Sequence, residues 1–243
     1  DIVHFNLPPA GEYVVGIAFL PRDDVAAAQA AADITRIVAE EDMVVLGWRQ
    51  VPIDSSPVGQ TARSTMPQFR QLFLGPASPV ADQLELERRA FCIRKRVDNT
   101  TDVYFPSLSS RTIVYKGMLT TDQLDVFFPD LRDERVASAV GLVHSRFSTN
   151  TFPTWDLAHP FRMIAHNGEI NTVQGNVNWF KAREQAISSP ILGDDLKKVW
   201  PLHYPGQSDS AAFDNALELL TMAGYSLAQA MMLMIPEAWE STR

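Results

Sequence analysis

The fold of this chain depends on two stretches of its sequence, HSRFSTNT at residues 144–151 and AHNGEINT at residues 165–172. The first stretch places Arg146 before a run of small hydroxyl residues. A guanidinium in that position can hold a planar carboxylate through two parallel hydrogen bonds while the loop closes over it. An exposed arginine beside a polar turn produces the same string, and arginine is mostly exposed. Arg146 is therefore a candidate carboxylate-binding residue that needs support from other motifs.

The second stretch places Asn167 and Gly168 directly after an apolar run at residues 161–166 that predicts a strand. An asparagine amide and a glycine N–H that converge on one point form an oxyanion hole for acyl transfer. Glycine suits the position because it allows a positive φ and a close approach of substrate. Asn-Gly is also the strongest short-range signal for an ordinary hairpin turn, so both interpretations stay open.

A third motif, GQSDS at residues 206–210, precedes a helical pattern that Ser210 is expected to cap. An aspartate such as Asp209 at a helix start usually supports only the cap. If it faces a pocket, its carboxylate can bind an ammonium group. Taken together, the three motifs describe a site for an amino acid that loses its side-chain amide.

The N-terminal part of the chain alternates strand and helix patterns. Strands are predicted at 13–20, 43–51 and 68–74, and helices at 24–41 and 80–97. This alternation predicts a small α+β layer over residues 13–97. The basic cluster Arg94-Lys95-Arg96 is expected at the end of the second helix, where cations oppose the helix dipole.

The pattern changes after Val103, where two short apolar runs at 103–108 and 112–117 predict a hairpin. The remaining expected elements are a short helix at 122–128, strands at 138–148 and 161–166, a helix soon after 168, a helix capped by Ser210, and a last helix that Ser226 caps and Pro236 ends.

Composition excludes several classes of protein. The formal net charge of −8 argues against a nucleic-acid partner, and the longest apolar run, Val14 to Leu20, is too short to span a membrane. The single cysteine, Cys92, cannot form an internal disulfide, so a cytoplasmic setting is expected. The histidines lack metal-ligand spacing, so no metal site is predicted. The chain has no initiator Met and no natural ending, and we expect an internal piece.

At these motifs the sequence resembles the class II (N-terminal nucleophile, Ntn) glutamine amidotransferases, and among them the glutamate synthases. The strings at 47–52 (GWRQVP) and 113–117 (IVYKG) fit the same resemblance. It implies that residues 1–243 are a partial glutamine amidotransferase type 2 domain, without its nucleophile segment and C-terminal remainder. The implied fold is α+β, an incomplete four-layer α/β/β/α Ntn-hydrolase sandwich, with residues 13–97 as an inserted α+β subregion.

The resemblance also implies a role for each candidate site residue. Arg146 binds the α-carboxylate of L-glutamine with Phe147 and Thr149 completing the loop, Asn167 and Gly168 form the oxyanion hole, and Asp209 binds the α-amino group.

The implied activity is hydrolysis of L-glutamine to glutamate and ammonia, which is passed on to aminate 2-oxoglutarate. FMN, an iron–sulfur cluster and a small NADPH-oxidising subunit are implied for the rest of the subunit, and no cofactor for this segment. The family's nucleophile is an N-terminal cysteine, whereas position 1 is Asp and Cys92 matches no nucleophile, so we expect this chain alone to be inactive.

Two alternatives stay open. One is another class II amidotransferase, such as a sugar-phosphate or nucleotide amidotransferase; the long segment before Arg146 argues against it, because the resemblance implies much less chain there in those enzymes. The other is a catalytically silent glutamine-binding module that keeps Arg146 and Asp209.

Overall fold

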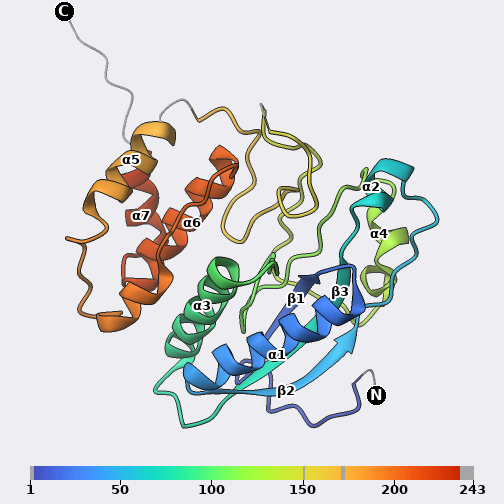
Figure 1. Cartoon of the computed structure of the whole chain (residues 1–243), viewed down its shortest axis with the longest axis horizontal. Coiled ribbons are helices and arrows are strands. Elements are labelled where there is room, and N and C mark those ends of the chain that lie inside the picture. Colours follow the sequence, from blue (N-terminus) through green and yellow to red (C-terminus); the bar gives the residue numbers. More distant parts are fainter. Residues whose placement is uncertain (1–2, 150, 171–172, 236–243) are drawn as a thin grey trace, which may run out of the picture.

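An antiparallel sheet of three strands organises the N-terminal half of the chain (Figure 1). The computed structural model describes residues 3–149, 151–170 and 173–235. The strands are β1 (Val14–Leu20), β2 (Met43–Gln50) and β3 (Gln68–Pro76), in the spatial order β1-β3-β2. All three predicted strands are confirmed within a few residues, because their apolar runs are long enough to be recognised without knowledge of their partners.

One face of this sheet is covered by two helices, α1 (Asp24–Glu40) and α3 (Gln83–Thr100). Asp23 caps α1 by accepting a hydrogen bond from the N–H of Ala26 at 2.9 Å. Since side chains alternate across a strand, Val14 and Leu20 point to the helices together with Leu72. The predicted helices of the 13–97 region are therefore confirmed, and their apolar faces form one core with the sheet.

The opposite face of the sheet packs against aromatic residues from later in the chain. Phe69 lies in edge-to-face contact with Phe127, Phe128 and Trp155, at ring-centroid distances of 5.5, 5.6 and 5.5 Å. Three short helices lie on this side: α2 (Gln60–Ser64), α4 (Leu124–Phe127) and the 3₁₀ helix η1 (Pro129–Arg132). Of these three, the sequence predicts only α4.

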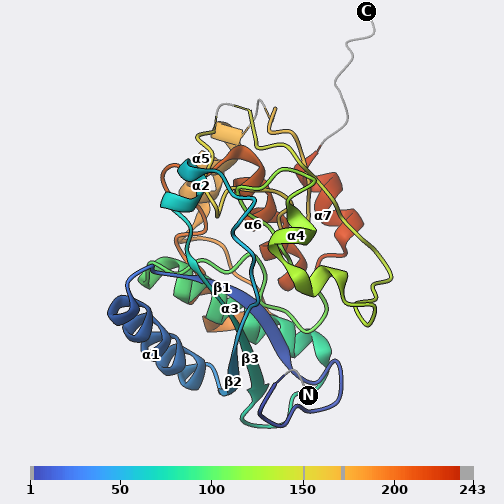
Figure 2. The ribbon, with the colours of Figure 1, turned by 90° about the vertical axis from the view of Figure 1, so that its right-hand side faces the viewer.

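The C-terminal helices form a second group above the sheet layer (Figure 2). They are α5 (Val173–Arg183), the 3₁₀ helix η2 (Gly193–Val199), α6 (Asp209–Met222) and α7 (Leu227–Met234). Ser226 caps α7 in the predicted capping box with Gln229, while Pro236 lies outside the described residues. Phe91 and Cys92 of α3 pack against Leu219 of α6, so α3 joins the two groups.

The predicted hairpin at 103–117 is wrong. Residues 103–109 instead lie along the free edge of β1, where Phe19 N–H donates to the Tyr104 carbonyl at 2.9 Å and Val15 N–H donates to the Ser109 carbonyl at 3.0 Å. A hairpin would need the backbone N–H groups of residues 112–117 to bond the carbonyls of the first strand. The Val114 N–H instead donates to the Ser107 Oγ at 2.9 Å, so a serine hydroxyl replaces a backbone acceptor.

The predicted strands at 138–148 and 161–166 are also wrong. Both segments are irregular, and Val140 and Val143 are 80% and 77% exposed. A strand needs a neighbour to bond its backbone, and among the described residues no other segment forms a backbone–backbone hydrogen bond with 138–147. The described part of the chain therefore contains one sheet, and the second sheet of the expected four-layer sandwich is not formed by these residues.

The prediction that the basic cluster ends a helix is wrong as well. Because α3 continues to Thr100, Arg94 and Lys95 lie inside it, with side chains that are 1% and 0% exposed. Arg94 pairs with Asp98 at 2.9 Å and also with Glu218 of α6. The two cations are thus part of the buried contact between the sheet layer and the C-terminal helices.

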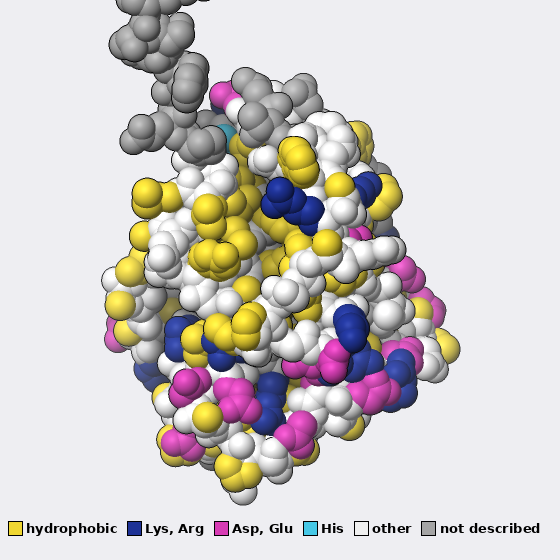
Figure 3. Space-filling view, turned by 90° about the vertical axis from the view of Figure 1, so that its left-hand side faces the viewer, with side chains coloured by type: hydrophobic (Ala, Val, Ile, Leu, Met, Phe, Trp, Pro, Cys, Tyr) yellow, Lys and Arg dark blue, Asp and Glu magenta, His cyan; other side chains and the backbone are white. Residues whose placement is uncertain are grey.

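One surface of the C-terminal helices is apolar. Figure 3 shows hydrophobic side chains gathered on the upper part of the face that carries α5 and α7, with charged side chains along its lower part. The exposed large apolar side chains of α5 and α7 are those of Trp179, Leu227, Met232 and Leu233. Contiguous exposed apolar side chains are typical of a surface that contacts other protein.

The close approach of residues 103–109 to β1 predicts a specific sensitivity at Gly16. A Cβ there would lie 2.3 Å from the Ser107 carbonyl oxygen, so we expect Gly16→Ala to lower the free energy of unfolding by about 1–3 kcal/mol. A Cβ at Gly175 in α5 would have no neighbour within 4 Å, and Gly175→Ala should raise that free energy by about 0.5–1 kcal/mol. Urea unfolding followed by circular dichroism measures both. Equal effects of the two changes would contradict this account of the β1 edge.

Candidate functional site

Three segments that the sequence singled out meet at one place. Thr149 donates to the Asn167 carbonyl twice, from its N–H at 2.9 Å and from its Oγ1 at 3.2 Å. Ser148 Oγ lies 3.1 Å from Ser210 Oγ at the start of α6, and both serines are buried. The loop 144–149, the loop 166–170 and the first turn of α6 therefore form one hydrogen-bonded unit.

Gly168 is the closest point between two of these loops. Its φ is +76°, and a Cβ at this position would lie 2.3 Å from the Cβ of Ser148. Only glycine satisfies both constraints, so the sequence-based requirement for glycine here has a structural cause. The Gly168 N–H donates to Nδ1 of His166 at 3.0 Å, a contact that sequence reasoning missed.

Asp209 is the first residue of α6 and is not its cap. Ser208 is the N-cap, and its Oγ accepts from the Ala211 N–H at 3.1 Å, so the prediction of Ser210 as the cap is wrong. Ser208 and Ser210 could each cap a helix from the sequence alone. The N-cap is the residue whose side chain accepts the backbone N–H two or three positions later, and here Ser208 accepts from Ala211. The carboxylate of Asp209 accepts from Ile170 N–H at 2.9 Å and from Ser210 N–H at 2.6 Å.

The side chains of Arg146 and Asn167 are exposed, and neither forms a hydrogen bond or ion pair with the residues that the structure describes. Phe147 and Thr149 are half-buried beside them. The backbone of Arg146 is held, because its carbonyl lies 2.9 Å from Nδ1 of His159. The main chain of the site is thus anchored while these polar side chains stay available to a ligand.

A buried ion pair lies behind the 166–170 loop. The Asp214 carboxylate is fully buried, accepts from Met163 N–H at 2.7 Å and Ile164 N–H at 3.2 Å, and pairs with Arg162 at 2.7 Å. Arg162 also donates to Asn215 at 2.6 Å and to Glu218 at 3.0 Å. The only sequence signal for this support is the run of polar residues inside an otherwise apolar helix.

Comparison with known proteins identifies the family that has these motifs. Residues 2–243 match the family described as glutamine amidotransferases class-II. The chain belongs to this family.

Three similar proteins are far longer than this chain, which spans 12–16% of their length. It is 46% identical over 241 residues to the glutamate synthase [NADPH] large chain of Bacillus subtilis, covering 97% of this chain and 16% of the relative. It is 43% identical over 235 residues to the chloroplastic ferredoxin-dependent glutamate synthase of Oryza sativa, covering 93% and 14%. Against the glutamate synthase [NADH] of Saccharomyces cerevisiae the identity is 41% over 247 residues, covering 96% and 12%.

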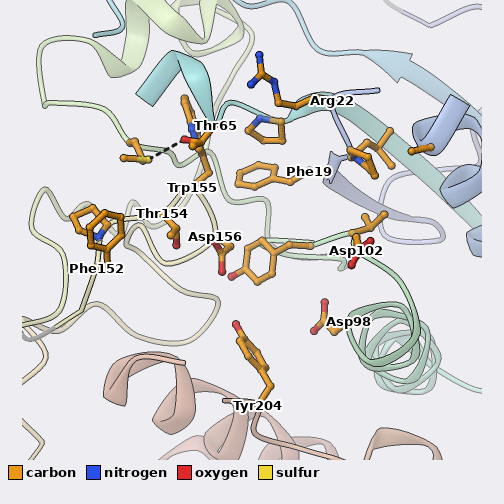
Figure 4. Close-up of a pocket in the computed structure, with 18 of the residues that line it drawn as sticks. Phe19, Arg22, Thr65, Asp98, Asp102, Phe152, Thr154, Trp155, Asp156 and Tyr204 are labelled. Carbon is orange, nitrogen blue, oxygen red and sulfur yellow. Dashed lines mark hydrogen bonds between the residues drawn. The ribbon is translucent and has the colours of Figure 1, made fainter. Parts of the chain in front are cut away.

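A large pocket of this class II amidotransferase lies apart from the six candidate site residues. A pocket of about 740 Å³ is bordered by the carboxylates of Asp98, Asp102 and Asp156 and by Tyr204 (Figure 4). It contains none of the six residues to which the resemblance assigns a role. A smaller cavity of about 90 Å³ includes His144 and His159 and lies next to the Arg146 loop. Pocket size therefore does not identify the candidate site in this chain.

This chain of the amidotransferase family does not supply the ligands of the iron–sulfur cluster implied for the longer protein. An iron–sulfur cluster requires several cysteine ligands, and Cys92 is the only cysteine. Burial raises the pKa of the Cys92 thiol to about 12, so it is no nucleophile either. Within residues 3–149, 151–170 and 173–235, no group of three His, Cys, Asp or Glu is placed to bind a metal, and no helix could cross a membrane.

The buried pair predicts a large effect of removing one charge. Asp214→Asn removes one of the two carboxylates that pair with buried Arg162 and leaves only Glu218, so we expect the free energy of unfolding to fall by about 3 kcal/mol, the lower end for a broken buried pair. Asp194→Asn removes a fully exposed partner of Lys197 and should cause no measurable change. Guanidinium unfolding of the two variants provides the test, and an Asp214→Asn protein as stable as Asp194→Asn would show that the pair does not support the loop.

Proposed function

We propose that this chain is the glutamine-binding part of the glutaminase domain of a glutamate synthase. The domain hydrolyses L-glutamine to glutamate and ammonia, and the remaining domains use the ammonia to aminate 2-oxoglutarate. The main support is that the 144–149 loop, the 166–170 loop and Asp209 meet in one hydrogen-bonded unit. Membership of the class II glutamine amidotransferases supplies the chemical context.

Arg146 binds the α-carboxylate of glutamine in this proposal. Its side chain is exposed and forms no ion pair with the described residues, so its two outer N–H groups can engage a carboxylate in parallel. Phe147 and Thr149 complete the loop, and the bond from His159 to the Arg146 carbonyl holds the backbone from which the arginine extends.

Asp209 binds the α-ammonium group. Its Oδ1 accepts from the Ser210 N–H at 2.6 Å and from the Ser210 hydroxyl at 3.3 Å, whereas its Oδ2 accepts only from the Ile170 N–H, at 2.9 Å, and keeps a free lone pair. The backbone donors therefore fix the plane of the carboxylate and leave it able to accept from a cationic ligand. With Arg146, this gives the site opposite charges for the two ends of an amino acid's backbone.

Asn167 and Gly168 form the oxyanion hole. The Asn167 amide is exposed and available, whereas the Gly168 N–H donates to the imidazole of His166. In the proposed reaction this N–H leaves the imidazole and donates to the oxygen that gains charge on the glutamine side chain. A neutral acceptor is exchanged for an anionic one, which strengthens the hydrogen bond in the transition state.

The nucleophile comes from outside the described residues, since Cys92 is buried in α3. In the family it is an N-terminal cysteine whose thiol attacks the side-chain amide carbon. The carbon–nitrogen bond then breaks, ammonia leaves with the thiol proton, and water hydrolyses the thioester to release glutamate. The chain spans 12–16% of the relatives' length, which leaves room for that residue.

The remaining parts of the proposal concern the longer protein. We propose that its additional residues complete a four-layer sandwich in which residues 13–97 are an insertion. They would pair with the 138–148 segment, most of which is exposed, and cover the apolar face of α5 and α7. We assign four further properties to that longer protein: FMN, the iron–sulfur cluster, contacts with a small NADPH-oxidising subunit, and a cytoplasmic location.

The experiment that tests this function uses the natural full-length polypeptide and an electrophilic glutamine analogue, with the adduct located by peptide mass spectrometry. A label on a cysteine outside this chain supports glutaminase activity. Glutamine binding without any label would instead support a silent glutamine-binding module, and a label on Cys92 would contradict the proposed site.

The charged side chains of the site give a quantitative prediction. In the full-length polypeptide, Arg146→Ala should raise the Kd for L-glutamine by about 10- to 150-fold, because charge-assisted bonds are lost. Arg146→Lys should give a Kd between those of the natural protein and Arg146→Ala, since a lysine cannot bind the carboxylate bidentately. Isothermal titration calorimetry measures these constants. The control is Arg135→Ala, an exposed arginine paired with Asp133, which should leave Kd unchanged; a weakening as large as that of Arg146→Ala would refute the assignment.

A further inference from the structure

Lys116 is a buried cation without a carboxylate partner among the described residues. Lys116 is 1% exposed. The Nζ donates to the Asp156 carbonyl at 2.6 Å and to the Tyr104 hydroxyl at 2.9 Å. It also lies 4.4 Å from the ring centre of Phe161 and 4.8 Å from that of Tyr104. The ammonium is therefore held by one carbonyl, one hydroxyl and two aromatic faces.

A chain of contacts leads from this ammonium to the Arg146 loop. The ring of Phe161 meets the ring of His159 edge to face at a centroid distance of 4.7 Å. Nδ1 of His159 lies 2.9 Å from the Arg146 carbonyl. Since a carbonyl only accepts, Nδ1 carries the proton of this bond. Burial, with His144 and Lys116 adding to it, lowers the pKa of His159 to about 4, so the ring is neutral near pH 7.

We propose that Lys116 is a positioning residue for the Arg146 loop, acting through Phe161 and His159, and that its positive charge strengthens glutamine binding. The attraction between the ammonium and the face of Phe161 fixes that ring. The fixed ring in turn orients the imidazole that donates to Arg146. This inference rests on the proposed function, in which Arg146 binds the glutamine α-carboxylate.

The groups around Lys116 make its charge sensitive to pH near neutrality. Burial, followed by the charge of Arg162, lowers the pKa of Lys116 to about 7, while Asp156, Asp214 and Asp98 oppose the shift. Tyr104 and neutral His159 face the same space. As pH rises through about 7 the ammonium loses its proton, and its attraction to Phe161 weakens. If the cation strengthens binding, glutamine affinity falls over the same interval.

A second buried lysine provides a matched control. Lys95 is 0% exposed, and its Nζ donates to the Leu202 carbonyl at 3.3 Å. Burial lowers its pKa to about 8. Among the described residues its polar contacts are with Leu202 and, at 4.0 Å, Asp98, and none is with the Phe161–His159 stack. Lys95→Met and Lys116→Met therefore both remove a buried ammonium, and only the second removes the one on the path to Arg146.

The test measures Kd for L-glutamine by calorimetry in the full-length polypeptide at about pH 6 and about pH 8.5, which bracket the Lys116 titration. For the natural protein we expect Kd to rise by about 3- to 30-fold from the lower to the higher pH, a range that runs from an exposed to a desolvated cation–π contact. Lys116→Met should show the weaker affinity at both pH values. Lys116→Arg should keep the tighter affinity at both, and Lys95→Met should behave as the natural protein.

His159→Phe is the second variant, because it keeps an aromatic ring on Phe161 and removes the donor to Arg146. It should show weak affinity at both pH values. If either Lys116→Met or His159→Phe binds glutamine with the natural Kd and the natural pH dependence, the inference is overturned and the proposed function stands. If the natural protein binds no glutamine at either pH, the inference and the proposed function are both overturned.

Discussion

The buried pair between Arg162 and Asp214 is the interaction on which the candidate site depends. Burying these two charges costs desolvation free energy. That cost is offset because Arg162 and Asp214 each form several hydrogen bonds or ion pairs. The main-chain donors at residues 163 and 164 fasten one end of the loop to α6. Ile170 fastens the other end to Asp209, five residues earlier in α6, or about 7.5 Å along the helix axis. The loop between these ties includes Gly168, whose position against Ser148 follows from them.

The same network connects the site to the sheet layer. Glu218 of α6 accepts from Arg162 at 3.0 Å and also pairs with Arg94 of α3. Arg94 in turn pairs with Asp98, whose carboxylate borders the large pocket. A charge change at any member alters the balance at the others, because buried charges are poorly screened. The α+β layer therefore contributes to the support of the site even though none of its residues lies within it.

The sequence predicted the parts of this structure that local patterns determine. β1 to β3 and the helices α1 and α3 have apolar periodicity that identifies them without knowledge of their partners. The 138–148 segment has a strand-like pattern too, but pairing depends on a neighbour that the described residues do not supply. At the site, the glycine requirement at Gly168 could be predicted, because it follows from backbone geometry. The roles of Arg162 and Lys116 could not, since each depends on contacts tens of residues away in sequence.

At the candidate site, the protein holds the backbone by hydrogen bonds and leaves two polar side chains without a partner among the described residues. The backbones of Arg146 and Asn167 are held by hydrogen bonds within the protein, and the Asp209 carboxylate accepts from the backbone N–H groups of Ile170 and Ser210. The Arg146 and Asn167 side chains are exposed and form no polar contact with described residues. Ordering a backbone is expensive in conformational entropy, whereas orienting an exposed side chain costs less. In such a site most of the conformational entropy is lost during folding and not during binding. A larger part of the free energy of each ligand contact therefore contributes to affinity. Neutral His159 serves this arrangement, because a charged imidazole would place a second cation beside Lys116.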